Sequence, residues 1–281
     1  MGHLLIAILL NVVPLIGVWK FGWSGGTVLL LFWVESLLGH FAAMIKIRRH
    51  AALTRKRGHV AYVSVDQRGG GGSYFAHFTR IALIFTFAHG FFLGVILAML
   101  AVNRPELTQF NVSWDNFKLG FGLVLLLLVV DLIIDLPQLA QRSFYWLESS
   151  TGKRLTRVLV MHLTLIFGFG AMAVFESPIA MLMVFLALKT LLDAGTSMYK
   201  DDASFESTYP KKPPAILRFL DKYRKKDGAQ TGSAAKKETL DEFWARGRTE
   251  ALQRREMHEQ VLHEQVVDTA ETVQRTRHKA E

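Results

Sequence analysis

The first 200 residues alternate between long apolar runs and short polar connections. About 20 apolar residues cross the hydrocarbon core of a bilayer, and a helix satisfies its own backbone hydrogen bonds there. The pattern therefore predicts an all-α, polytopic membrane protein with a bundle of six transmembrane helices in residues 1–199. The six runs are His3–Trp19, Gly26–Lys46, Thr79–Ala101, Phe117–Leu136, Val158–Phe175 and Pro178–Ser197.

The first run resembles a signal peptide in length only. No Lys or Arg precedes its apolar part, and no small-x-small cleavage site follows it. Signal peptides have both features, so we expect a retained helix.

Residues 200–281 form a different kind of segment, a charged tail that we expect to be cytoplasmic, helical in part and disordered in part. Residues of about 214–226 have an apolar side and cations clustered at the end, which predicts a short amphipathic helix on the membrane surface. The apolar side consists of Ile216, Leu217, Phe219, Leu220 and Tyr223. Residues of about 240–277 are dense in Glu, Gln and Arg, with a broken heptad stripe too short for a stable coiled coil. A solvated helix, or one that pairs with a protein partner or a second copy, is favoured.

Cations between the runs predict the orientation. The connections after the second and fourth runs are rich in Lys and Arg, whereas the alternate connections carry few. Cytoplasmic loops carry the excess of Lys and Arg, so both termini are expected in the cytoplasm of a cell inner (plasma) membrane. The cations are Arg48, Arg49, Arg55, Lys56, Arg57 and Arg68 in one connection, and Arg142, Lys153, Arg154 and Arg157 in the other.

The net charge of +9 does not indicate a nucleic-acid surface. Residues 200–281 hold 17 basic and 15 acidic side chains, and most remaining cations lie in the two connections, where topology explains them. The chain has no cysteine, which excludes disulfides, thiolate metal sites and cysteine nucleophiles.

Ionisable side chains occupy the middle and inner half of five predicted helices. A charge at that depth costs several kcal/mol unless it is paired, hydrated or neutralised, and such residues usually mark functional sites. We expect a polar site open to the cytoplasm. Its candidate residues are Glu35, His89, Asp131, Asp135, His162, Lys189 and Asp193.

Spacing adds a constraint. Asp131 and Asp135, like Lys189 and Asp193, are four residues apart, so each pair shares a helix face. These aspartates lie toward helix C-termini, where the helix dipole disfavours anions. They need compensation from another helix.

The cluster has more carboxylates than cations, because its four carboxylates face only Lys189 and Arg80. Protonation, hydration of Asp135 at the boundary, or a divalent metal could restore the balance. The metal hypothesis assigns zinc, manganese or iron to four ligands, although no close motif such as HExxH is present. Those ligands are Glu35, His89, Asp131 and His162.

Structural roles remain open for some of these residues. Asp135 precedes Pro137 at a helix end, where water can reach it. His40, near the inner boundary, is more simply explained as a buried structural histidine, and Lys189 with Asp193 as a structural ion pair.

Three segments resemble an uncharacterised prokaryotic membrane family, a domain of unknown function. They are Phe32-Trp33-Val34-Glu35-Ser36, Phe87-Ala88-His89-Gly90-Phe91 and the Lys189-x-x-x-Asp193 spacing. That family carries an aromatic-Trp-x-Glu signature followed by Phe-x-x-His-Gly, and the similarity covers roughly residues 3–199. The resemblance implies a membrane domain and draws attention to the named polar residues, but it implies no substrate.

A rhomboid protease has a comparable six-helix layout. Its Gly-x-Ser-Gly nucleophile motif is missing from the fourth run, so that mechanism is excluded.

Three functions remain. The preferred hypothesis is binding or transport of a proton, ion or small ligand at the polar site. One alternative is an intramembrane metal-dependent hydrolase acting on a lipid or peptide. The other is a non-catalytic scaffold that recruits a partner through its tail, with polar contacts locking the helices together.

Overall fold

The protein is helical wherever regular structure is described. A computed structural model describes residues 2–64, 72–103, 111–152, 154–155, 187, 210–215, 217–219, 221 and 239–262. Within these ranges no strand is present, and β contacts are limited to two isolated bridges, Lys56 with Val261 and Tyr62 with Gly72.

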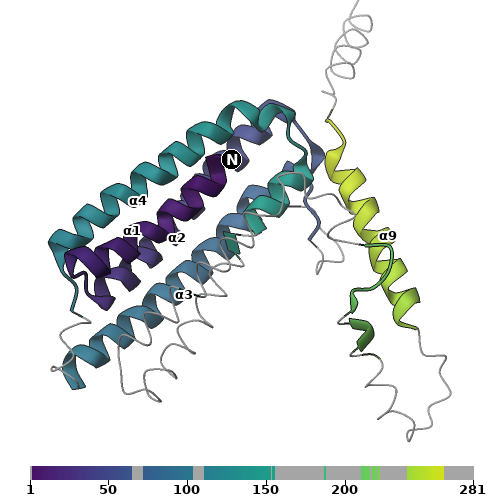
Figure 1. The fold of residues 1–281 in the computed structure, drawn as a ribbon. Coiled ribbons are helices and arrows are strands. Elements are labelled where there is room, and N and C mark those ends of the chain that lie inside the picture. Colours follow the sequence, from purple (N-terminus) through teal and green to yellow (C-terminus); the bar gives the residue numbers. More distant parts are fainter. Residues whose placement is uncertain are drawn as a thin grey trace, which may run out of the picture.

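Four long helices form one bundle, and a fifth lies outside it (Figure 1). Short 3-10 segments follow α2 and α4, and residues 144–152 are again helical. The elements are α1 (Gly2–Phe21), α2 (Gly25–Thr54), η1 (Arg57–His59), α3 (Tyr74–Asn103), α4 (Trp114–Asp135), η3 (Leu136–Gln141) and α9 (Leu240–Glu259).

Helix α2 is central to the described part of the bundle. It packs against both α3 and α4, and α1 packs against α4. One apolar cluster joins α2 to α3 around Phe32 and Leu93, and another surrounds Phe78 and Phe144 at the other end. Between the residues that α2 contributes to these two clusters lie Glu35 and His40.

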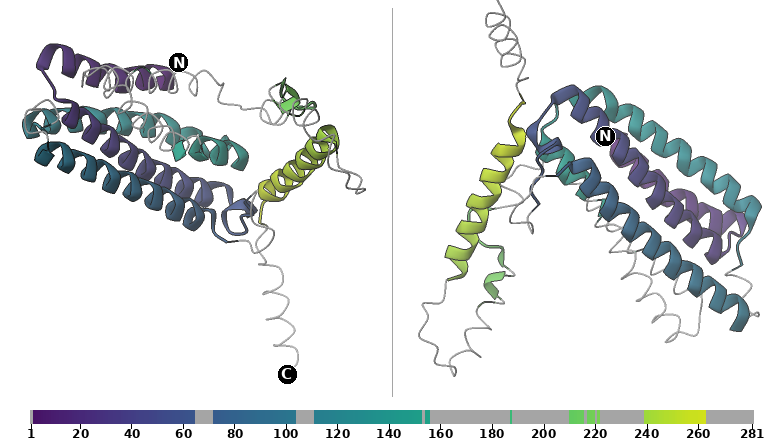
Figure 2. Two further views of the ribbon diagram at one scale, coloured as in Figure 1. Left: turned by 90° about the horizontal axis from the view of Figure 1, so that it is seen from below. Right: turned by 180° about the vertical axis from the view of Figure 1, so that it is seen from behind.

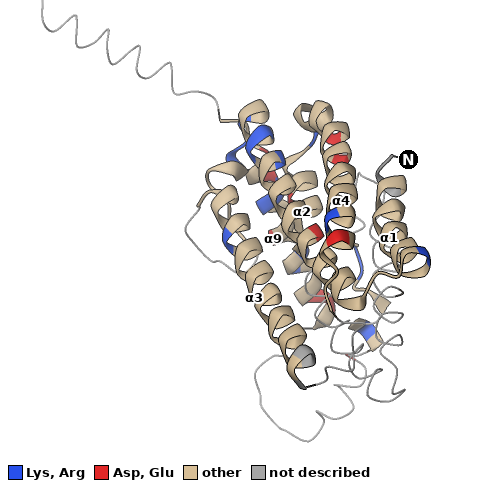
Figure 3. Cartoon of the chain, turned by 90° about the vertical axis from the view of Figure 1, so that its left-hand side faces the viewer, with Lys and Arg blue, Asp and Glu red and all other residues tan. Residues whose placement is uncertain are grey.

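Three described helices are long and apolar enough to cross a membrane. They are Gly25–Thr54, Tyr74–Met99 and Trp114–Gln141, with a shorter apolar helix at Leu5–Phe21. Charged residues are few along α1 and α3, which carry only Lys20 and Arg80 (Figure 3). Large apolar side chains are exposed on α3 and α4, such as Phe91 at 77%. Contiguous apolar surface of this kind is unusual on a soluble monomer and is compatible with contact with lipid.

The first four predicted runs are confirmed as helices. The second helix continues eight residues beyond the predicted end at Lys46, to Thr54. The polar residues that follow the apolar run remain helical until the left-handed cap at Arg55. Ser24 caps its start by accepting a hydrogen bond from the Thr27 backbone N–H at 3.1 Å. The runs Val158–Phe175 and Pro178–Ser197 lie outside the described residues, so six spans remain a prediction.

Helix α9 begins where the terminal tail helix was expected. Thr239 and Glu242 form a reciprocal capping box that fixes its start. The helix ends at Glu259, Gln260 is extended, and residues 263–277 of the predicted helix lie outside the described part of the chain. Figure 2 shows α9 lying across one end of the bundle, beside the loop that follows α2. We call this end the α9 end.

Candidate functional site

Two of the predicted site residues meet a lysine inside the bundle. Lys46 Nζ on α2 forms ion pairs with Asp135 and, at 3.3 Å, with Asp131 Oδ2, both on α4. Arg154 Nη2 approaches the same Asp131 oxygen at 3.2 Å. The side chains of Lys46 and Asp135 are only 6% and 8% exposed. We call these four residues the charge quartet.

The charge quartet is neutral, with two cations and two carboxylates. Asp131 and Asp135 share a face of α4, and the compensation that they require comes from other elements, α2 and the segment after residue 152. In a low-dielectric interior, removal of one member of a buried ion pair typically costs 3–5 kcal/mol, since a charge is then buried alone. The quartet therefore constrains how α2 and α4 pack.

Glu35 lies on the same side of α2 as the quartet. It precedes Gly39 by four residues and Lys46 by eleven, which places all three near one face of the helix. A Cβ atom at Gly39 would be 3.1 Å from Arg154 Nη1, so the guanidinium lies against α2 one turn from Glu35. Glu35 Oε2 is itself buried. Glu35 and the quartet therefore lie along one side of α2, and we call them together the polar column.

A second polar contact joins α2 to α3 through Thr86. His40 Nδ1 lies 2.8 Å from Thr86 Oγ1, and Trp33 Nε1 donates a 2.9 Å hydrogen bond to the Thr86 carbonyl. A Cβ atom at Gly90 would lie 2.5 Å from Trp33 Nε1, so only glycine lets the indole approach. Two of the three segments that carried the family resemblance therefore contact each other directly, through Trp33 and Gly90.

His89 is buried next to this contact. It is 3% exposed and follows Thr86 by three residues, which places it on a neighbouring part of the α3 surface. Phe87 precedes His89 by two positions, one fewer than the Phe-x-x-His-Gly spacing requires. Only the His-Gly pair of that signature fits this chain.

The remaining predicted site residues, His162, Lys189 and Asp193, lie outside the described residues. Among those that are described, no group of three or more His, Asp or Glu is placed to hold a metal ion. The proposed metal set includes His162, so the metal hypothesis stays a prediction. Asp131 Oδ2 is already approached by two cations.

Sequence reasoning missed Lys46 and Arg154. Lys46 was taken as the end of an apolar run, and Arg154 as one cation of a cytoplasmic loop. One signal could have identified Lys46. No helix-breaking residue follows it before residue 54, so the helix continues and Lys46 lies inside it rather than at its end. The pairing of Arg154 with Asp131 depends on tertiary structure and had no local signal.

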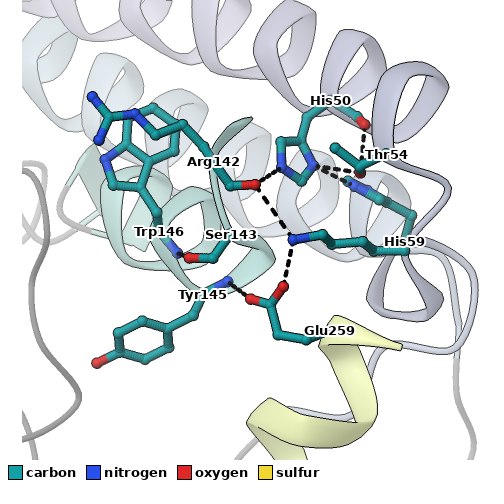
Figure 4. Close-up of polar contacts among 9 residues, drawn as sticks. His50, Thr54, His59, Arg142, Ser143, Tyr145, Trp146 and Glu259 are labelled. Atoms are coloured by element: carbon teal, nitrogen blue, oxygen red, sulfur yellow. Dashed lines mark hydrogen bonds and ion pairs between the residues drawn. The ribbon is translucent and has the colours of Figure 1, made fainter. Parts of the chain in front are cut away.

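A further polar cluster, also missed, lies at the α9 end (Figure 4). Lys56 Nζ binds Glu259 Oε2 at 2.5 Å, and Glu259 Oε1 accepts the Tyr145 backbone N–H at 3.0 Å. Burial opposes ionisation of Glu259, but the hydrogen bonds from Lys56 and from the backbone keep its pKa below the usual value. One carboxylate of the tail thus joins the loop after α2 to the helix at residues 144–152.

Residues 3–211 match a family of unknown function (DUF6498). No curated protein and no solved structure matches the chain.

Proposed function

The chain belongs to DUF6498, a family of unknown function, and from this premise we propose that it is a membrane protein that binds and conducts protons or small ions along α2. The column would take up its ligand at the α9 end and carry it to Glu35. A small polar ligand held at the same residues is the nearest variant of this proposal.

The observation that carries the proposal is the alignment of Glu35 with the charge quartet on one side of α2. Ionisable chains inside membrane helices are characteristic of proton and ion pathways. Lys46 and Arg154 share Asp131 Oδ2, so a change in protonation of one carboxyl group alters the pairing of the other. Such an arrangement can pass a proton between adjacent sites.

The proposed topology follows from the positions of the cations. Six spans would place both termini in the cytoplasm of the inner (plasma) membrane, with the α9 end on the cytoplasmic side. The chain lacks cysteine, so single cysteines at Gln253 and at Trp19 can be labelled in intact cells with an impermeant maleimide. Labelling of Trp19→Cys alone supports this orientation, and labelling of Gln253→Cys alone reverses it.

Proton flux in proteoliposomes tests the function. Glu35→Gln should abolish a pH-dependent flux that the wild-type protein supports, because the amide cannot exchange a proton at that position. Glu250→Gln, at an exposed position on α9, is the matched control and should leave flux unchanged. Equal flux in Glu35→Gln and wild type, with both proteins folded, contradicts the proposal.

The same preparation addresses the two alternatives. A metal-dependent hydrolase requires about one equivalent of a transition metal by elemental analysis, and less than about a tenth of an equivalent counts against it. A scaffold predicts that substitutions in the column lower stability without a distinct loss of activity.

A further inference from the structure

The end of α9 docks onto the bundle through buried histidines. His258 on α9 is 2% exposed, and His50 on α2 and His59 in η1 are 0% and 6% exposed. The ring of Phe144 contacts both His59 and His258, with centroids 5.0 and 5.2 Å away. We call the three histidines the histidine dock.

Hydrogen bonds fix the protons of the first two rings (Figure 4). His50 Nε2 lies 3.1 Å from the carbonyl oxygen of Arg142, which can only accept, so Nε2 carries the proton. In the neutral ring His50 Nδ1 then has a lone pair, and His59 Nε2 donates to it at 2.7 Å. The neutral pair therefore leaves one unused lone pair, on His59 Nδ1.

An additional proton on this pair resides on His59 Nδ1, because the hydrogen bond between the two rings holds only one hydrogen. His59 Nδ1 is buried and makes no hydrogen bond within the described structure. Protonation would create a buried N–H donor without an acceptor, which is costly to retain. The pair is stable in this packing only while it is neutral.

His258 requires neutrality for a different reason. Its Nε2 accepts the Val63 backbone N–H at 3.1 Å, and its ring stacks on Tyr62 with centroids 5.1 Å apart. A proton on Nε2 would place two donors against each other. Protonation of His258 therefore breaks the contact that holds α9 to residues 62–63.

Charged groups around the dock mostly oppose an additional cation. Lys56 and Arg57 come from the loop after α2, and Arg254 from α9. Glu259 favours a cation, but it is already paired with Lys56. Glu148, on the helix at residues 144–152, accepts the Tyr62 hydroxyl at 2.7 Å, and burial raises its pKa.

We propose that the histidine dock is a proton-released latch, which holds the end of α9 against the bundle while its imidazoles are neutral and frees it on acidification. On release, residues 258–262 would separate from the loop after α2. In the docked state the Arg57 backbone N–H donates a 2.7 Å hydrogen bond to the Gln260 carbonyl. The inference goes beyond the proposed conduction and does not depend on it. His50 lies one turn beyond Lys46, so release would also open the end of the polar column to water.

The direction of the pH dependence follows from linkage. Burial lowers the pKa of His59 and of His258 from 6.5 to about 4, and neighbouring cations add to this effect. Between these values the released state binds more protons than the docked state, so docking is strongest above pH 6.5 and weakens as pH falls toward 4. For His258 alone the docking constant should fall about tenfold from about pH 7.5 to about pH 5.5.

Two carboxylates bear on this dependence. The pKa of Glu259 is below its usual value in the docked state. Its ion pair with Lys56 is therefore lost only at a pH below the range in which the imidazoles titrate. Glu148 acts in the opposite direction, because protonation of a buried carboxyl group with a raised pKa favours the docked state.

Spin-label distances in the full-length protein in nanodiscs test the latch. Cysteines replacing the exposed Ala52 on α2 and Gln253 on α9 would carry the labels. The distance distribution should be narrow at about pH 7.5 and become broad and longer at about pH 5.5. Distributions that are the same at both pH values overturn the proposal.

A paired variant identifies the groups that titrate. In His59→Gln/His258→Gln the amide nitrogen of residue 59 can donate to His50, and the amide oxygen of residue 258 can accept from Val63. This variant should remain docked at both pH values, whereas Glu148→Gln should retain the transition. A transition that persists in the double variant contradicts the latch.

If the double variant is undocked at every pH, the pH midpoint of the wild-type transition still tests the proposal. A midpoint between about 5 and 6.5 identifies imidazoles, whereas one below about 5 identifies carboxylates and overturns the proposal.

Discussion

At the scale of single residues, the interior of the bundle is organised by charge compensation. Asp131 and Asp135 sit near the C-terminal end of α4, where the helix dipole disfavours anions, and Lys46 and Arg154 neutralise them. The sequence predicted the need for this compensation from i,i+4 spacing. It did not identify the cations, because their proximity depends on how α2 and α4 pack.

Removal of Lys46 should therefore be costly. Lys46→Met leaves two carboxylates buried near a single guanidinium, and we expect a loss of about 3–5 kcal/mol in the free energy of unfolding. Lys46→Met/Asp135→Asn should recover a large part of that loss, because one uncompensated charge is gone. Urea unfolding in detergent, followed by tryptophan fluorescence, measures both.

Lys118→Met is the matched control for this prediction. Lys118 pairs with Asp115 on α4, but the two side chains are 73% and 96% exposed, and exposed pairs contribute little. A loss at Lys118 equal to that at Lys46 would show that the quartet has no special role.

At the scale of elements, helix positions followed from the sequence more closely than helix ends. Four apolar runs predicted α1 to α4, but α2 continues through Arg48 and Arg49 to Thr54. Hydropathy reports which residues can face lipid, whereas a helix ends at a cap, here Arg55 with φ of 48°. The contact between α2 and α3 was similarly hidden, since Trp33 and Thr86 are 53 residues apart.

Gly90 should be essential to that contact. Gly90→Ala places a Cβ 2.5 Å from Trp33 Nε1, and overpacking of this kind costs about 1–3 kcal/mol. Gly94→Ala, one turn further along α3 with nothing within 4 Å, should be neutral or slightly stabilising because alanine favours helices. Thermal unfolding in detergent compares the two, and equal midpoints would contradict the packing of Trp33 on α3.

At the scale of the whole molecule, the tail is part of the structure at the α9 end. Its polar composition predicted a solvated or partner-dependent helix, because α9 has no continuous apolar stripe. The docking uses instead a few polar residues at its last turn, His258 and Glu259. Contacts between residues 114 to 203 positions apart leave no periodic signal in the sequence.

The docked tail should resist proteolysis. Glu259→Ala removes the acceptor for Lys56 Nζ and the Tyr145 N–H, and charge-assisted hydrogen bonds contribute about 1.5–3 kcal/mol each. We expect trypsin to cleave α9 about tenfold faster or more in this variant at neutral pH. Glu256→Ala, exposed three residues earlier, should match the wild type, and equal rates for both variants would argue against the dock.

The most direct test concerns proton exchange by Glu35, at the end of the polar column farthest from the α9 end. Infrared difference spectroscopy of the protein in lipid, recorded across a pH titration, detects the carbonyl stretch of a protonated carboxyl group directly. Proton exchange by Glu35 predicts a carboxylic-acid band that grows on acidification and is missing from Glu35→Gln. Identical difference spectra for the wild type and Glu35→Gln over the whole titration would contradict it.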